Sequence, residues 1–383
     1  MVSISKESKE LEEYLYKNEW EKFRCEKCNR LYWTKSYVSK ENCQELDCLP
    51  AKKYIFSSII RKKRRIVPLY TLFKDYMNFF KELGYKETEP NDIYRGKDTF
   101  FIICGLQKWD DILEGKRLPD KERYVFNQPS VRLTDIDKLN TGRHLTAFNM
   151  LSIQQFDVGR KDYVDVLDHI LQYYSDVVGL PVHEMTLVED VWRGGNAWGP
   201  CLETNIGGVE IGTLVYIVSP IKGVDVGLGL ERIGWVLSKS DTVWDVIGPI
   251  ENSLFEEYSS MNTLRTVTLL IGQNILPSKK GAGYVIRKLI KDNLNELRRV
   301  NIPKLTRYYY DEWSKFIKLY LSENEVENII EKEIDRELLA KVSKIVGYES
   351  LKKLTSKNFE EFIVHLHEDV IPLDMLRKKI KES

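Results

Sequence analysis

Short apolar and β-branched runs, separated by turn residues, fill the middle of the chain from Pro68 to about Pro249. Such runs include RYVFNQPSVRL (123–133), HLTAFNML (144–151), VEIGTLVYIVS (209–219) and VDVGLGL (224–230). A helical pattern, LFKDYMNFFKELGY at 72–85, comes before them. Closely spaced strands without regular alternation with helices predict an antiparallel sheet flanked by helices, in an α+β domain.

The last third of the chain has a different pattern. Apolar residues recur three and four positions apart in VIRKLIKDNLNEL (285–297) and EEFIVHLHEDV (360–370), which predicts helices. We therefore expect three regions: an N-terminal appendage at 1–64, the α+β domain at 65–250 and a helical domain at 251–383. A length of 383 residues with 43% apolar residues suits a globular chain of this size.

Charge and hydropathy exclude few partners. Lys plus Arg and Asp plus Glu each number 58, so the overall charge indicates no partner class. Apolar runs stay well short of the roughly 20 residues that a membrane span needs. The start, MVSISKESKELEEYL, also lacks the apolar core of a signal peptide. We expect a cytoplasmic protein that does not bind a membrane.

Four of the six cysteines cluster near the N-terminus, at Cys25, Cys28, Cys43 and Cys48. Two close pairs joined by a loop can place four thiolates around one tetrahedral Zn²⁺, which stabilises a small segment with little core of its own. Four thiolates leave no open coordination position, so such a zinc would be structural. The alternative is that these are free, buried thiols.

The stretch VDVGLGLERIGWV (224–236) places two glycines, an acid and an arginine where a strand enters a helix. It does not match a dinucleotide fingerprint, because Arg232 occupies the third glycine position, nor a Walker loop. We expect the strand that carries Asp225 to break at Gly227 and Gly229 before the helix opens. The bare backbone there, followed by the forked donors of Arg232, can bind a phosphate group. A simple glycine-rich turn would give the same pattern.

The stretch from Asn127 to Leu151 predicts two strands joined by a polar loop, with Arg132 on the first. On the second, period-two spacing puts His144, Thr146 and Phe148 on one face. An arginine facing an aromatic ring across neighbouring strands can hold a nucleotide. A hairpin whose phenylalanine fills the core explains the same residues.

Five segments together resemble one family. NQPSVRLTDID (127–137), TGRHLTAF (141–148), GGNAWGPCLE (194–203), VDVGLGLERI (224–233) and ILPSKKGAGYVIRKLI (275–290) are similar, in order and spacing, to the alanyl-tRNA synthetases. The archaeal type is most similar, since it also carries an N-terminal cysteine cluster. The resemblance covers nearly the whole chain and implies a class II synthetase-like fold with a helical tRNA-recognition domain.

The resemblance also implies roles for the matching residues. The catalytic arginines would be Arg132, on the α-phosphate of ATP and the amino-acid carboxylate, and Arg232, on the γ-phosphate. Phe148 would stack on adenine, and Asp225 would receive the ammonium group of the amino acid. The remaining expected contacts are His144 and Gly229 for ATP, Trp192 and Thr213 for the amino acid, and Glu203 and Glu210 for Mg²⁺.

The helical region would bind tRNA. Arg265, Lys279 and Arg287 are the expected contacts, within a basic segment that also holds Lys280, Lys288, Lys291, Arg298 and Arg299. Acidic residues interleave with them, so a solvated helix face is equally compatible with the pattern. The family's editing and C-terminal oligomerisation segments have no counterpart here, so a partner protein would supply them or the chain would be a paralogue.

Three functions are compatible with the sequence. The chain could activate alanine with ATP and transfer it to the 3′ end of tRNA, or activate a small amino acid for another acceptor. It could also bind amino acid or RNA without turnover. Two departures from the family favour this third interpretation: Asn149 stands where the family has glutamate, and Lys279 where it has asparagine.

Overall fold

The computed structural model describes residues 8–35, 42–49, 66–134, 136–248, 258–297 and 300–346. The chain divides into two compact units. The first comprises Met1–Asn252 with Lys315–Ile317, and the second comprises Ser253–Ser314 with Lys318–Ser383. The division into three predicted domains stays a prediction.

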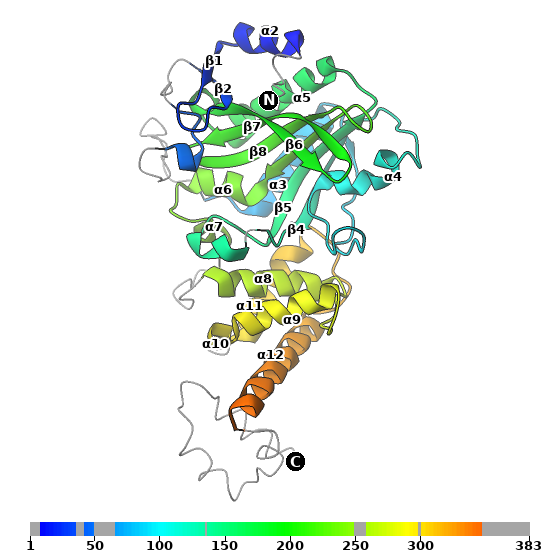
Figure 1. Cartoon of the computed structure of the whole chain (residues 1–383), viewed down its shortest axis with the longest axis vertical. Helices are drawn as coiled ribbons and strands as arrows, with labels where there is room; N and C mark the ends of the chain where they lie inside the picture. Colours follow the sequence, from blue (N-terminus) through cyan, green and yellow to red (C-terminus); the bar gives the residue numbers. More distant parts are fainter. Residues whose placement is uncertain are drawn as a thin grey trace, which may run out of the picture. The chain divides into compact units, whose positions relative to one another are not determined.

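Nine strands of the described chain form one sheet, in the order β1-β2-β6-β7-β8-β9-β5-β4-β3 (Figure 1). Neighbouring strands are antiparallel, except that β3 and β4 run parallel. The predicted α+β class, with a largely antiparallel sheet flanked by helices, is confirmed. The strands are β1 Trp20–Arg24, β2 Leu31–Lys35, β3 Lys86–Glu87, β4 Tyr124–Val131, β5 Ala147–Phe156, β6 Thr186–Gly194, β7 Ala197–Ile206, β8 Val209–Ile217 and β9 Gly223–Gly229.

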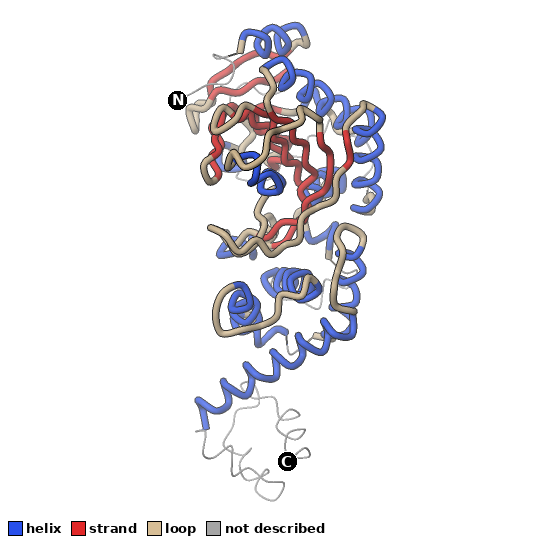
Figure 2. Tube along the Cα trace, turned by 90° about the vertical axis from the view of Figure 1, so that its right-hand side faces the viewer, coloured by secondary structure: helices blue, strands red, loops and turns tan. Residues whose placement is uncertain are grey.

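Long helices lie along one face of this sheet, whereas loops and a short helix cover the other (Figure 2). The described α-helices of the first unit are α2 Lys9–Lys17, α3 Leu69–Glu82, α4 Asp110–Leu113, α5 Arg160–Gln172, α6 Leu230–Ser238 and α7 Trp244–Ile247. Helix α3 begins directly after Pro68, whose ring suits the first turn, and ends before Gly84, which has φ of +84°. It therefore lies about three residues earlier than the pattern at 72–85 predicts.

Alternation along the strands decides which side chains face the helices. On β5, Leu151 and Ile153 are fully buried, and Ile153 lies opposite Val226 of β9. Tyr163 of α5 donates a hydrogen bond to the carbonyl of Leu214 on β8, at 3.0 Å, which fixes that helix to the sheet. The intervening residues of these strands point to the opposite face, where the polar side chains gather.

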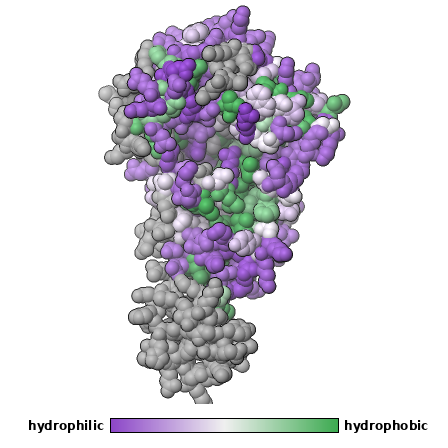
Figure 3. Space-filling view, viewed as in Figure 1, coloured by the Kyte–Doolittle hydropathy of each residue, from purple (hydrophilic) through white to green (hydrophobic). Residues whose placement is uncertain are grey.

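The second unit is helical, as the apolar spacing predicts. Its described helices are α8 Tyr258–Gly272, α9 Ala282–Asp292, α10 Leu294–Leu297, α11 Ile302–Ser314 and α12 Glu323–Val346. The helix expected at 360–370 lies outside the described residues. Among the helices that are described, each is too short or too polar to span a bilayer. Hydrophilic side chains cover much of the described surface in Figure 3, and apolar ones gather in smaller areas.

Candidate active site

The sheet face turned away from the long helices carries a continuous row of functional side chains. Asp225 on β9 lies opposite Gln154 on β5 and Val215 on β8. Two residues from Val215, Thr213 lies opposite Glu203 on β7. Because alternate residues of a strand share a face, the register alone brings these side chains together from four strands.

This row lines a cavity of about 540 Å³ within the first unit. Ten residues that the sequence singled out for ATP, amino acid or Mg²⁺ contribute to its wall. They are Arg132, His144, Phe148, Trp192, Glu203, Glu210, Thr213, Asp225, Gly229 and Arg232. The structure thus brings all ten into one cavity, while their individual roles stay predictions.

Arg132 and Phe148 form a stacked pair at the cavity wall. The Arg132 guanidinium lies 5.1 Å from the centroid of the Phe148 ring. Its Nε donates to the carbonyl of Ile103, at 2.8 Å, which fixes the direction of the planar fork. Arg132 follows the end of β4, but its backbone N–H still bonds the carbonyl of Thr146 at 2.8 Å. The predicted pairing of arginine and aromatic across two strands is therefore present.

The second strand of this hairpin begins later than the pattern predicts. Strand β5 starts at Ala147, so His144 and Thr146 precede it. His144 still reaches the cavity, where its Nδ1 lies 3.2 Å from Oγ1 of Thr141. Thr146 is buried at 1% exposure and is not part of the cavity wall. His144 and Phe148 thus reach the cavity as expected, but Thr146 does not. The reason is that the loop before β5 does not keep the alternation of a strand.

Asp225 is a carboxylate deep in the cavity, 8% exposed. Gln154 donates its Nε2 to Oδ1 of Asp225 at 2.7 Å. Burial raises the pKa of Asp225 to about 6, although the Gln154 hydrogen bond and the charge of Arg132 both lower it. A buried carboxylate with few protein donors is suited to receive a cationic group from a ligand.

Arg232 is held by Glu210 at the cavity wall. Its Nη1 donates to the backbone carbonyl of Glu210 at 2.9 Å and to Oε2 at 3.2 Å, and Thr213 donates to Oε1 at 2.8 Å. A Cβ on Gly229 would stand 3.3 Å from the Arg232 side chain, so the glycine leaves room for it. Gly227 does not break the strand as predicted, because it pairs with both Ser152 and Thr213 within the sheet.

Three acids meet around one arginine that sequence reasoning missed. Arg30 Nη1 donates to Asp190 at 2.8 Å and to Glu203 at 2.9 Å, and its Nη2 lies 3.7 Å from Glu45. Burial, together with the charge of Glu210, raises the pKa of Glu203 to about 8, against the opposing effect of Arg30. The only sequence signal for Arg30 was its position two residues after Cys28, and its partners Asp190 and Glu203 lie 160 and 173 residues away.

The four cysteines of the N-terminal cluster come together as predicted. Their sulfur atoms all lie within 4.8 Å of one another, and those of Cys28 and Cys43 are 3.7 Å apart. Zinc–sulfur bonds of about 2.3 Å in a tetrahedron give sulfur separations of about 3.8 Å. Burial and the charges of the neighbouring cysteines raise the pKa of Cys43, and a bound cation would oppose this effect and favour its thiolate. The cluster fits Zn²⁺, and the identity of the metal stays a prediction.

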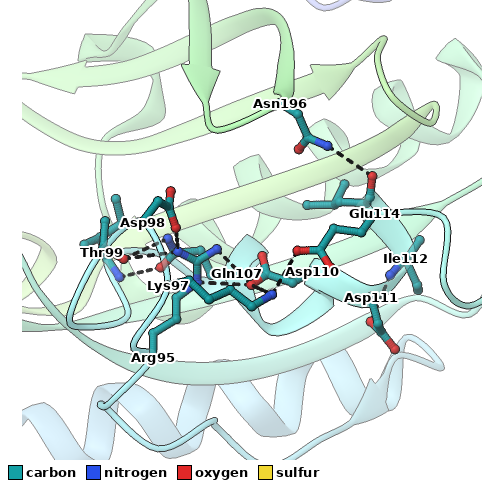
Figure 4. A network of polar contacts seen from close by, with 12 residues as sticks. Arg95, Lys97, Asp98, Thr99, Gln107, Asp110, Asp111, Ile112, Glu114 and Asn196 are labelled. Carbon is teal, nitrogen blue, oxygen red and sulfur yellow. Dashed lines mark hydrogen bonds and ion pairs between the residues drawn. The ribbon is translucent and has the colours of Figure 1, made fainter.

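A second cavity, of about 960 Å³, shares Cys104, Arg132, Trp192 and Arg193 with the first. Ion pairs fix the loop between β3 and Gly105, residues 88–104, which lines this cavity (Figure 4). Arg95 and Lys97 of this loop both contact Asp110, at 2.8 and 2.9 Å. The same loop contains Ile103, whose N–H donates to Gln107 at 2.8 Å and whose carbonyl accepts from Arg132. The network therefore stabilises the loop that orients Arg132.

Asn149 lines neither cavity, but its partner Glu231 lies on the wall of the first. Both its backbone N–H and its Nδ2 donate to the buried carboxylate of Glu231 at 3.0 Å. Its Oδ1 accepts from Asn127 at 2.8 Å. Period-two alternation turns Asn149 from the face of Phe148, so it reaches the cavity wall only through Glu231. Its two N–H groups satisfy this buried carboxylate without adding a charge.

In the second unit, the three expected tRNA contacts differ in accessibility. Arg265 is 2% exposed, and its guanidinium lies 4.2 Å from the ring centroid of Trp313, which counts against a contact with phosphate. Arg287 pairs with Glu333 at 3.1 Å and with Glu337 at 3.2 Å. Lys279 is exposed, whereas Arg298 and Arg299 lie outside the described residues. Of the three, Lys279 is the most available to a polyanion.

Comparison with known proteins points to one family. Residues 71–217 match the family model "tRNA synthetases class II (A)". The chain is 26% identical over 90% of its length to an alanine–tRNA ligase of Pyrobaculum aerophilum, of which it covers 48%. It is 24% identical over 97% of its length to that of Saccharolobus islandicus, of which it covers 50%. The chain thus spans about half the length of these relatives.

Among solved structures, a pyrrolysyl-tRNA synthetase of Desulfitobacterium hafniense aligns with 50% of this chain and 77% of its own, at 14% identity and a TM-score of 0.38. The sequence matches carry the assignment, because they cover most of the sheet that forms the cavity. Residues 71–217 match the class II tRNA synthetase family model, and nearly the whole chain is similar to alanine–tRNA ligases.

Proposed function

We propose that the chain activates a small amino acid, alanine in the first instance, with ATP and transfers it to the 3′ end of a tRNA. The observation that carries this proposal is one cavity in which an arginine stacked on an aromatic ring, a deeply buried carboxylate and a second arginine all face the same space. The relatives bearing the name alanine–tRNA ligase support alanine as the amino acid.

ATP would lie across the cavity from Phe148 to Arg232. The Phe148 ring would stack on adenine, with His144 and the bare backbone of Gly229 beside the nucleotide. Arg132, oriented by Ile103, would bind the α-phosphate and the amino-acid carboxylate at once. Arg232 would bind the γ-phosphate and hold the triphosphate bent.

The amino acid would bind by its ammonium group to Asp225. On the β8 side of this acid the side chains in the sheet are small and apolar, since Val215 lies opposite Asp225 and Cys201 lies opposite Val215. With Trp192 and Thr213, which also line the cavity, they would surround the side chain of the amino acid. Such a pocket discriminates against one extra methylene by only about 1–3 kcal/mol, so alanine, glycine and serine must be compared directly.

Glu203 and Glu210 would hold Mg²⁺ on the phosphates. Both line the cavity, and each lies close enough to the other for its charge to matter, as the raised pKa of Glu203 indicates. Mg²⁺ is usually bound by one or two carboxylates together with substrate phosphates, which matches this donor set. When bound, the ion would neutralise charge on the β- and γ-phosphates.

The chemistry then requires positioning and positive charge more than an acid or a base. A carboxylate oxygen of the amino acid attacks the α-phosphorus, the bond to the β-phosphate oxygen breaks, and pyrophosphate leaves with the electron pair. Both reactants are anionic, so Arg132 and Arg232 offset their repulsion and hold them in line. In the second step a ribose hydroxyl of tRNA attacks the acyl carbon and AMP leaves.

The test is amino-acid-dependent exchange of pyrophosphate into ATP, measured with each of the twenty amino acids and followed by charging of total tRNA. We expect alanine-dependent exchange, and a loss of at least about 100-fold in Arg132→Ala and Asp225→Ala. Arg117→Ala and Asp157→Asn, which alter exposed ion pairs outside the cavity, are the matched controls. Normal exchange in both cavity variants would show that the residue assignments are wrong. Exchange without tRNA charging would indicate a different acceptor.

A further inference from the structure

Arg30 is one of two described residues that bring the cysteine cluster to the first cavity; the other is Glu45, which lies between Cys43 and Cys48 and lines the cavity wall. Arg30 ends the loop Cys25–Arg30, which connects strands β1 and β2, and this loop contributes two of the four clustered cysteines. Its side chain leaves the loop and reaches the acids of β6 and β7 at the wall of the first cavity. The side chains of Arg30 and Glu203 are each only 20% exposed, so this contact is largely shielded from water.

The backbone of Arg30 depends on the shape of the cysteine loop. The N–H of Cys25 donates to the carbonyl of Arg30 at 2.9 Å, and the N–H of Asn29 donates to the carbonyl of Cys25 at 2.9 Å. Asn29 has φ of +62°, a left-handed conformation that closes the turn and that asparagine tolerates well. A metal held by the sulfurs of Cys25 and Cys28 would fix this turn, and with it the origin of the Arg30 side chain.

The side chain of Arg30 continues into the polar contacts of the cavity. Arg30 pairs with Glu203, the charge of Glu210 acts on Glu203, and Glu210 accepts from Arg232. Without a cation at this position the carboxylates of Glu45, Asp190, Glu203 and Glu210 would repel one another and turn apart. The Arg30 guanidinium fixes the directions of Asp190 and Glu203, because both accept from its Nη1, whose two N–H bonds lie in one plane.

We propose that Arg30 is a positioning residue that couples the cysteine cluster to the triphosphate end of the cavity. With metal on the four sulfurs, Arg30 holds Asp190 and Glu203 so that Glu203 and Glu210 present their carboxylates to Mg²⁺ and the phosphates. This inference rests on the proposed function in one respect: it takes ATP as the nucleotide that binds in the cavity. It gives the cysteine cluster a part in substrate binding beyond the stability of the N-terminal segment.

The first test compares Arg30→Met and Arg30→Lys with the wild type, each zinc-loaded. In Arg30→Met we expect the KM for MgATP in pyrophosphate exchange to rise about tenfold or more, since one partner of a shielded charge pair is removed. The KM for the amino acid should change less than about threefold. Arg30→Lys should recover part of the loss, because the charge returns without the fork. Arg24→Met is the matched control. Arg24 is an exposed arginine next to the same loop, and its described hydrogen bonds go to Asn29.

A second test reads the coupling without turnover. In protein loaded with Co²⁺ in place of zinc, the thiolate absorption bands report on the cysteine cluster. We expect MgATP to shift these bands in the wild type and in Arg24→Met, but not in Arg30→Met. By reciprocity, removal of the metal should weaken MgATP binding in the wild type and have little further effect in Arg30→Met.

The outcomes separate the two proposals. If the wild type shows no amino-acid-dependent exchange, the proposed function fails, and the cobalt bands still decide the coupling. If the wild type exchanges and Arg30→Met keeps its KM for MgATP, the positioning role is overturned. Independent, multiplicative effects of metal removal and Arg30→Met would overturn the coupling, because they would show that the two sites act separately.

Discussion

Asp225 shows how one residue of this sheet serves chemistry at a cost in stability. It lies in the middle of β9 between apolar neighbours that face the helices, and only Gln154 donates to it among its described hydrogen bonds. Burial raises its pKa to about 6 from the usual 3.8. Between these values the folded state holds the proton more tightly than the unfolded state does. The carboxyl therefore favours folding at low pH, and this contribution is lost as the pH rises through about 6.

Asp225→Asn should accordingly stabilise the protein near neutral pH. We expect its free energy of unfolding to exceed that of the wild type by about 1–3 kcal/mol at pH 7.5, because the amide carries no charge to desolvate. The gain should vanish at about pH 4, where the wild-type carboxyl is largely protonated in the folded state. Urea unfolding at the two pH values measures this. Asp157→Asn, on an exposed turn, is the control and should stay within about 0.5 kcal/mol of the wild type at both.

Several of these residues could be predicted individually, but their surroundings could not. The arginine and aromatic of the hairpin and the acid of β9 follow from strand patterns and from family resemblance. The Ile103 carbonyl that orients Arg132 comes from a loop without a recognisable pattern. Arg30 meets Glu203 across 173 residues, and single-sequence periodicity carries no information on such long-range pairs.

At the scale of elements, the sheet itself was predictable because closely spaced β-rich runs with turn signals leave no room for crossover helices. The exact course of its strands was not. Gly227 stays in the ladder although glycine weakens strands, because it is paired on both sides, and a Cβ there would meet Met150 at 2.9 Å. Tertiary pairing thus overrides the local signal that predicted a break.

Alternation on β5 also explains the amide at position 149. The family's glutamate would place a second carboxylate beside Glu231, which is 1% exposed, whereas Asn149 supplies a donor to it. We expect Asn149→Asp to lower the free energy of unfolding at pH 7 by about 2–4 kcal/mol, since two acids would then share one buried site. Part of this loss should return near pH 5, where one proton can be shared.

Urea unfolding checks this against Gln155→Glu on the same strand. Gln155 is also buried, but it accepts from Arg123 at 3.2 Å, so a new carboxylate there has a cation beside it, although the donor to the carbonyl of Lys121 is lost. This variant should lower the free energy of unfolding by only about 1 kcal/mol, less than Asn149→Asp does. Equal losses in the two variants would show that the strand rejects any acid, and that Glu231 is not the cause.

At the scale of the whole molecule, the two units divide the work that we propose. The cavity residues all belong to the first unit, whereas the basic residues expected to contact RNA belong to the second. Within the second unit, the cations differ in what holds them. Arg265 is packed under Trp313, and Arg287 is paired with two glutamates, so both support the helices. Lys279 and Lys280 are exposed just before the first turn of α9.

Replacing Lys279 and Lys280 together by alanine should therefore separate activation from transfer. Removing a cation that binds a phosphate weakens tRNA binding and lowers its salt dependence. We therefore expect the KM for tRNA in charging to rise about tenfold at low salt, with a shallower salt slope. Pyrophosphate exchange should stay within about twofold of the wild type, because the cavity is untouched. Lys332→Ala, on the exposed side of α12, is the control for charge alone. A parallel fall in exchange would show that these lysines act on the first unit. An unchanged KM for tRNA would place the acceptor elsewhere.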